Sequence, residues 1–183
     1  TEIQRVILEN HLAAKYNASI QASGNDFYAY QGTHSFGVAG LGKVDASTFK
    51  TSTQSDSTIT ISNASNLDDG EYFIFGHDDG LIDTYVTTEA PAGLIRLTRE
   101  WRVDQTGDVG TVNISVDTTS FTGTISSIFT ERVLLVDSDG DFSSGSTIVP
   151  LTQNGSAYEA SNVDLSDGSF FTYAIISPEV SFR

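Results

Sequence analysis

From about residue 19 onward, the sequence is divided into short apolar or alternating runs by Gly, Asn, Asp and Ser. Runs of this length, separated by polar turns, are typical of strands in an all-β fold. Thr, Val, Ile and aromatic residues favour strands, and only 3 Pro interrupt pairing. The pattern predicts an antiparallel β-sandwich, immunoglobulin-like or jelly-roll-like, of roughly 11 strands. We expect strands at residues 26–30, 36–41, 57–62, 71–76, 82–87, 94–103, 109–117, 131–136, 147–151, 156–160 and 169–176.

Residues 2–17, EIQRVILENHLAAKYN, are the one segment with helical periodicity, because apolar side chains recur there every three or four residues. Thr1 can cap the start of this helix, and Asn17 can end it. The apolar arc is broad, which favours packing of the helix against a sheet. A second interpretation makes residues 1–18 the end of a preceding domain, or a contact to one.

The remaining residues, 19–183, are interpreted as one β-sandwich unit. A weak internal echo relates LDDGEYF at 67–73 to LSDGSFF at 165–171, where each copy is a polar turn followed by an aromatic strand. The echo leaves two interpretations open: two halves that meet near residues 90–93, or one sandwich that uses the motif twice. We favour one unit, because the first half has few strands for an independent fold.

Net charge excludes several classes of partner. The chain has 9 Lys and Arg against 24 Asp and Glu, a net charge of -15. Nucleic acid and anionic membrane surfaces would repel it, so neither is expected as a partner. No apolar run approaches the roughly 20 residues that span a bilayer, so membrane insertion is not expected.

Cys and Met are both absent from the chain. Their absence excludes disulfides, thiolate zinc sites and a cysteine nucleophile. An acidic, Cys-free chain rich in Ser, Thr, Asn and Gly is typical of bacterial surface and secreted proteins, so we expect an extracellular or cell-surface location. Such a domain must be stabilised by its core, to which a bound metal can add.

Six stretches carry a resemblance to a known family: VILENHLAAKYN, FYAYQGTHSFGVAGLGKVDAS, QSDSTITIS, DDGEYFIFGHDDG, REWRVDQTGDVGTVNISVD and RVLLVDSDGDFSSG. In this order they resemble an uncharacterised β-sandwich domain that follows laminin-G/concanavalin-like domains in large secreted or cell-surface proteins of Bacteroidetes and other marine bacteria. The resemblance implies no established catalytic activity, so no catalytic residue is transferred. The sequence departs from the commoner pattern at Leu41 and Lys43, where Ile and Arg are usual.

Three aspartates at alternate positions, Asp137, Asp139 and Asp141, follow an apolar run. Oxygen ligands at positions 1, 3 and 5 of a tight loop suit Ca²⁺, which is therefore the one cofactor that the sequence suggests. The loop departs from the EF-hand pattern, because Phe142 and Ile148 stand where Gly and Glu are required. The alternative is a solvated turn in which the Asp side chains bond local N–H groups.

Other catalytic or metal-binding patterns are weak. His77-Asp78-Asp79-Gly80 has no second His at ligand spacing, so a loop is favoured over a metal site. Glu100 lies between Arg99 and Arg102 in sequence, which favours a structural ion pair over a catalytic carboxylate. No G-x-S-x-G motif is present. We expect no enzymatic activity.

Aromatic residues are the candidates for sugar binding. Tyr28 and Tyr30 share one face of an expected strand, which suits either a core or a binding platform. Trp101 is the only Trp, and it is interpreted as a core residue in preference to an exposed platform.

The sequence therefore predicts a non-catalytic structural and adhesive module of a secreted bacterial surface protein or extracellular filament. Its expected partners are neighbouring domains or identical subunits, contacted through edge strands or the helix. The alternative is a carbohydrate-binding module that recognises an extracellular polysaccharide, with Tyr28, Tyr30 and Trp101 as the ligand-binding residues.

Overall fold

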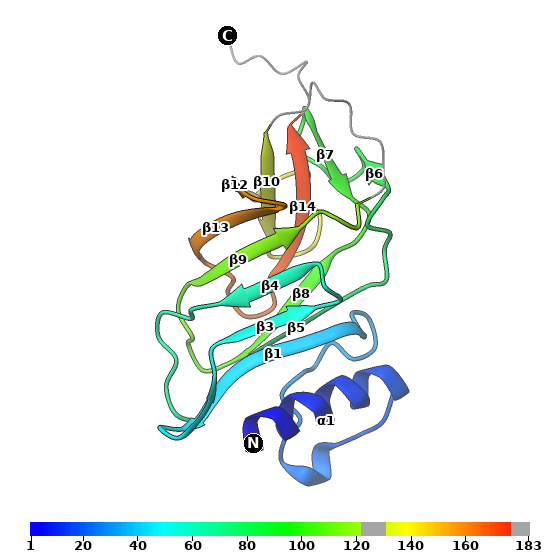
Figure 1. Cartoon of the computed structure of the whole chain (residues 1–183). Coiled ribbons are helices and arrows are strands. Elements are labelled where there is room, and N and C mark those ends of the chain that lie inside the picture. Colours follow the sequence, from blue (N-terminus) through cyan, green and yellow to red (C-terminus); the bar gives the residue numbers. More distant parts are fainter. Residues whose placement is uncertain (122–130, 177–183) are drawn as a thin grey trace.

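A computed structural model describes residues 1–121 and 131–176, which form one α-helix, one 3-10 turn and fourteen strands (Figure 1). The predicted all-β antiparallel fold with one N-terminal helix is confirmed, since every strand pairing is antiparallel. The elements are α1 (Glu2–Tyr16), η1 (Gln21–Ser23), β1 (Phe36–Asp45), β2 (Thr48–Lys50), β3 (Ser52–Ser55), β4 (Ile59–Ser62), β5 (Glu71–His77), β6 (Tyr85–Val86), β7 (Leu94–Leu97), β8 (Trp101–Thr106), β9 (Val112–Asp117), β10 (Arg132–Asp137), β11 (Thr147–Pro150), β12 (Thr152–Asn154), β13 (Ala157–Val163) and β14 (Phe170–Ile176).

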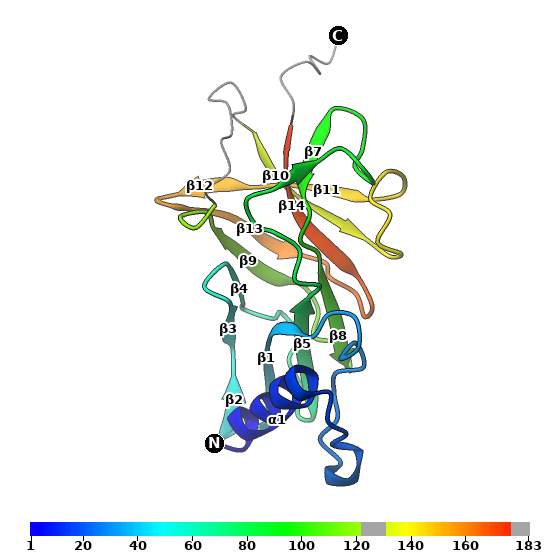
Figure 2. The same ribbon diagram turned by 90° about the vertical axis from the view of Figure 1, so that its right-hand side faces the viewer.

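The strands form two sheets. The larger sheet has nine strands, with the main order β11-β10-β14-β8-β5-β1-β2 and with β7 paired to β14 and β6. The smaller sheet has the order β12-β13-β9-β4-β3. Figure 2 shows the two sheets side by side, with α1 at one end of the molecule. Each sheet combines strands from before and after residues 90–93, so the two halves of the sequence share one core.

The main hydrophobic core is shared by the two sheets. It contains buried side chains of β1, β5, β8, β10 and β14 from the larger sheet and of β4, β9 and β13 from the smaller one. Trp101 is fully buried there and stacks on Phe171 with ring centroids 5.6 Å apart. Alternation along each strand directs one set of side chains to this core and the other set to the outer face of the strand's own sheet.

Helix α1 begins and ends as the sequence predicts. Thr1 is the N-cap of a capping box with Gln4, and Asn17 ends the helix in a left-handed conformation with φ 50°. Ile3, Val6 and Ala14 pack into a second core on the outer face of the larger sheet, so the helix covers this domain's own sheet. No helix in the described part of the chain is long and apolar enough to cross a membrane.

Helix α1 runs antiparallel to β1, and the residues that face each other are spaced at nearly the same distance along the two elements. Four helical residues advance about 6.0 Å, and two strand residues advance about 6.6 Å, so every fourth helix residue meets every second strand residue. Two of the strand positions are glycines, and a Cβ on either would lie within 3.5 Å of the helix side chain above it. The pairs are Ile3 with Gly42, Ile7 with Gly40, and His11 with Val38.

Three parts of the strand prediction were wrong. Residues 26–30 are a turn and loop over the sheet, and the expected strand 94–103 is two strands, β7 and β8. Strands β2, β3 and β12 were not expected, because TFK, STQS and TQN are short and polar. The remaining predicted strands correspond to observed ones, with different ends.

Candidate functional site

A polar cleft of about 640 Å³ lies between the loop that follows α1 and strand β8. The outer face of β8 points Asp104 and Thr106 toward this loop, because Trp101 and Val103 of the same strand point into the core. The cleft combines carboxylates, amides, hydroxyls and the edges of two aromatic side chains. Its lining residues are Asn17, Ala18, Ser19, Gln21, Asp26, Phe27, Tyr28, Ala29, Gln31, Asp104 and Thr106.

Two carboxylates face this cleft. Asp104 accepts a hydrogen bond from the backbone N–H of Ala29, and burial raises the pKa of its carboxyl group. Asp26 accepts a hydrogen bond of 2.8 Å from the side-chain amide of Gln31. The cleft can therefore accept hydrogen bonds from hydroxyl or amine groups of a ligand. None of these four residues was a candidate from the sequence, since three lie in a loop that the alternating pattern predicted as strand or left unassigned.

The three aromatic residues predicted to bind a ligand differ in their exposure and surroundings. Tyr28 is buried, and its hydroxyl donates to the carbonyl of His34 at 2.7 Å. Trp101 is in the main core. Tyr30 is half-buried, and the guanidinium of Arg102 lies 3.7 Å from its ring centroid. These residues do not form an exposed platform of parallel rings.

The Asp loop, residues 137–146, is a series of side-chain caps. Oδ1 of Asp137 accepts from the N–H groups of Asp139 and Gly140, at 2.8 and 3.1 Å. Asp139 and Asp141 cap the N–H two residues further on in the same way, at 2.9 and 3.0 Å. No group of three or more metal-ligating side chains converges among the residues that the structure describes. Each aspartate uses one oxygen for the turn, as the alternative interpretation of the sequence proposed.

His77 is held by both of its ring nitrogens. Nδ1 accepts from the N–H of Asp79 at 3.0 Å, so Nε2 carries the proton and donates to Asp56 at 2.7 Å. The guanidinium of Arg99 lies 3.9 Å from the same carboxylate oxygen, and together the two contacts lower the pKa of Asp56. Asp56 was not a candidate from the sequence, because it is 21 residues away in a hairpin between β3 and β4.

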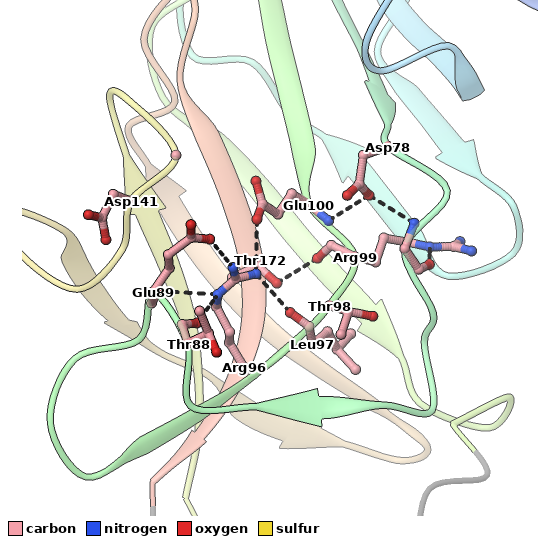
Figure 3. A network of polar contacts seen from close by, with 12 residues as sticks. Asp78, Thr88, Glu89, Arg96, Leu97, Thr98, Arg99, Glu100, Asp141 and Thr172 are labelled. Atoms are coloured by element: carbon pink, nitrogen blue, oxygen red, sulfur yellow. Dashed lines mark hydrogen bonds and ion pairs between the residues drawn. The ribbon is translucent and has the colours of Figure 1, made fainter.

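Arg96 is the centre of a buried polar network (Figure 3). Its side chain is 5% exposed, and it pairs with Glu89 at 2.7 Å and with Glu100 at 3.0 Å. It also donates to the carbonyls of Thr88, Glu89 and Leu97. These contacts attach the 78–93 connection, which joins β5 to β7, to the body of the domain. The expected ion pair of Glu100 is thus with Arg96, four residues before it.

Burial raises the pKa of Glu100 to about 7, because desolvation and the nearby carboxylates of Asp78 and Glu89 outweigh the attraction of Arg96. The folded state therefore binds a proton that the unfolded chain releases near pH 4.5. We expect this group's contribution to the free energy of unfolding to fall by up to about 3 kcal/mol as pH rises from 4.5 to 7. Urea unfolding of wild type and Glu100→Gln across this range should show the variant gaining relative stability as pH rises.

The matched control for this pH dependence is Glu9→Gln on the surface of α1. Hydrogen bonds from Arg5 and Asn25 lower the pKa of Glu9, so its small effect on stability has the opposite sign. A constant difference between wild type and Glu100→Gln from pH 4.5 to 8 would contradict the assignment of the raised pKa to Glu100.

The fold and cleft define the class: an antiparallel all-β domain with one helix packed on the outer face of its larger sheet. The sequence model of a family described as a domain of unknown function (DUF8202) matches residues 4–169. The chain belongs to this family. No curated protein and no solved structure matches the chain.

Proposed function

We propose that this domain is a non-catalytic structural and adhesive β-sandwich module of a secreted bacterial surface protein or extracellular filament. In this proposal it follows laminin-G/concanavalin-like domains in large proteins, in agreement with the sequence resemblance, and contacts neighbouring domains or identical subunits. Its acidic, Cys-free composition resembles that of bacterial surface and secreted proteins.

The observation that carries this proposal is the distribution of exposed apolar side chains. Large hydrophobic residues exposed in the described part of the chain number seven, and four of these belong to α1 and β2. Leu8, Leu12 and Tyr16 recur every four residues, so they form one outer row on the helix. Phe49 is exposed on β2, a short edge strand of the larger sheet. An apolar row beside an unpaired strand edge is suited to contact with another protein surface.

Self-association tests the proposal directly. Sedimentation velocity over a concentration series should show wild-type chains associating, and Leu8→Gln/Leu12→Gln should weaken this by about tenfold or more. Leu81→Gln is the matched control, because Leu81 is as exposed but lies in the 78–93 connection. A wild-type chain that stays monomeric at the highest concentrations would refute contact between identical subunits.

Calcium binding by the Asp loop is a further part of the proposal. Each aspartate uses one carboxylate oxygen in the turn, which leaves its second oxygen to bind a cation. Thermal unfolding in millimolar Ca²⁺ and in excess EDTA tests it. A cation that binds only the folded state adds about 2.7 kcal/mol at a concentration 100 times its Kd. The expected result is a higher Tm in Ca²⁺ for wild type and no such rise for Asp139→Ala. Equal Tm values in both conditions would remove calcium from the proposal.

A second candidate function is binding of an extracellular polysaccharide in the cleft. The observation that favours it is the meeting of Asp26, Gln31 and Asp104 around a cavity of about 640 Å³, since such groups hydrogen-bond sugar hydroxyls. Titration calorimetry against a panel of oligosaccharides tests it. A binding ligand should lose most of its affinity for Asp26→Ala, and no binding across the panel would refute this function.

A further inference from the structure

A groove of about 250 Å³ lies between α1 and the strands β1 to β3. Ile7, Leu8 and Val38 give it apolar walls, and Gln4, Thr53 and Gln54 add neutral polar groups. Lys50 and His11 contribute its basic groups. The groove thus joins the outer apolar row of the helix to the edge strand β2.

Lys50 is a basic side chain without an acidic partner in this groove. Its ammonium donates one hydrogen bond, to the carbonyl of Gly40 at 3.0 Å, and it belongs to none of the ion pairs among the described residues. Partial burial lowers its pKa, and no carboxylate raises it. In a chain of net charge -15, this half-buried cation pairs with none of the described carboxylates, and it would gain from a carboxylate brought by another molecule.

The Asp loop lies at the opposite edge of the larger sheet, and its negative charge is complementary to the positive charge of Lys50. Asp139 and Asp141 are exposed in the loop between β10 and β11, and Ile148 is exposed on the edge strand β11 that follows this loop. The sheet order places β11 and β2 at its two ends, and Figure 2 shows these strands far apart. One edge therefore presents an apolar side chain with a basic group, and the other presents an apolar side chain with acidic groups.

We propose that copies of this chain assemble head to tail, with the Asp loop and β11 of one copy against the α1–β2 groove of the next. The inference rests on the proposed structural function and names its partner. Asp139 and Asp141 supply the carboxylates for Lys50, while Ile148 packs on the apolar wall of the groove. Because the two surfaces differ, the contact is heterologous, and repeated contacts add copies one after another into a ring or a filament in place of a two-fold dimer.

Side-chain contacts determine this interface, and a long run of backbone hydrogen bonds between strands of the two copies is not expected. Strand β2 has three residues and β11 has four, and Pro150 at the end of β11 has no N–H to donate. Short edges with a proline limit uncontrolled strand addition. Charge and apolar complementarity then select which edge meets which.

A charge-reversal experiment tests the proposal. Sedimentation velocity is measured in EDTA, so that no metal neutralises the loop. Lys50→Glu and Asp139→Lys/Asp141→Lys should each be monomeric, because each sets like charges against one another. An equimolar mixture of the two variants should assemble again, because both contacts then join opposite charges. Lys15→Glu is the matched control, since Lys15 is exposed on α1, the helix that forms one wall of the groove, but does not line the groove.

Folding of the variants is checked by their thermal unfolding, and Lys50→Gln provides a milder change that should weaken assembly by about tenfold. Restoration in the mixture supports the proposal. Assembly of both charge-reversed variants by themselves would overturn it and leave the proposed function intact. Failure of folded variants to assemble on mixing would also overturn it. A wild-type chain that is monomeric at every concentration would overturn this inference together with self-association as the proposed function.

Discussion

Gly76→Ala is expected to lower the free energy of unfolding by about 3 kcal/mol or more, a Tm decrease of roughly 6–12 °C for a chain of this size. A Cβ at Gly76 would collide with the carbonyl of His34, and it would lie 2.7 Å from the hydroxyl of Tyr28 and 2.8 Å from Val38. Strand β5 has paired neighbours on both sides, so it cannot move away from these atoms.

The expected damage from Gly76→Ala is specific to the loop over the sheet. The hydrogen bond from Tyr28 to His34 closes this loop, and the new methyl group would displace both partners. Calorimetric unfolding measures the stability loss. Gly32→Ala is the control, because a Cβ at Gly32 has no atom within 4 Å, and this variant should be neutral or slightly stabilised. Equal Tm values for the two variants would show that the loop is not packed on β5 in this way.

Arg96→Ala should lower the free energy of unfolding by about 3–5 kcal/mol, because it leaves the largely buried carboxyl group of Glu100 without its cation. Glu100 is 17% exposed, and Glu89 is held over the sheet by the same guanidinium. The carbonyls of Thr88 and Leu97 lose their donor as well. Urea unfolding measures this cost, and limited proteolysis should show faster cleavage within residues 78–93.

Two variants calibrate the Arg96 result. Arg5→Ala removes an arginine from two exposed pairs on α1, with Glu2 and Glu9, and should change stability by less than about 1 kcal/mol. Arg96→Lys keeps the charge but lacks the fork that reaches several acceptors, so we expect an intermediate loss. If Arg96→Ala were as mild as Arg5→Ala, the network in Figure 3 would not hold the 78–93 connection.

The helix and most strands were predictable because their signals are local. Thr1 and Asn17 cap α1 by rules that depend on neighbouring residues, and apolar alternation marks strands such as β9 and β10. Residues 26–30 show the limit of that logic. The N–H of Phe27 donates to the side-chain oxygen of Asn10, and the N–H of Ala29 donates to the carboxylate of Asp104. Side chains therefore take the place of the neighbouring strand that the alternating pattern implies.

The site was predicted less well than the fold, because its members are distant in sequence. Asp104 is 75 residues from Ala29, and Asp56 is 21 residues from His77. Nor does local sequence show why the segment 94–103 is divided: β7 pairs with β14 and β6, whereas β8 pairs with β5 and β14. Which partner a strand chooses is a property of the whole chain.

The match between α1 and β1 limits how the lengths of these two elements can vary in evolution. Deleting one residue between Ile3 and Ile7 would rotate the rest of the helix by about 100° and carry its core side chains out of the contact. Deleting one residue between Gly40 and Gly42 would instead turn the following strand residues to the other face of the sheet. Homologues should therefore keep both spacings free of single-residue insertions and deletions, and accept length changes in the loop from residue 17 to 35. A set of aligned family sequences can check this expectation.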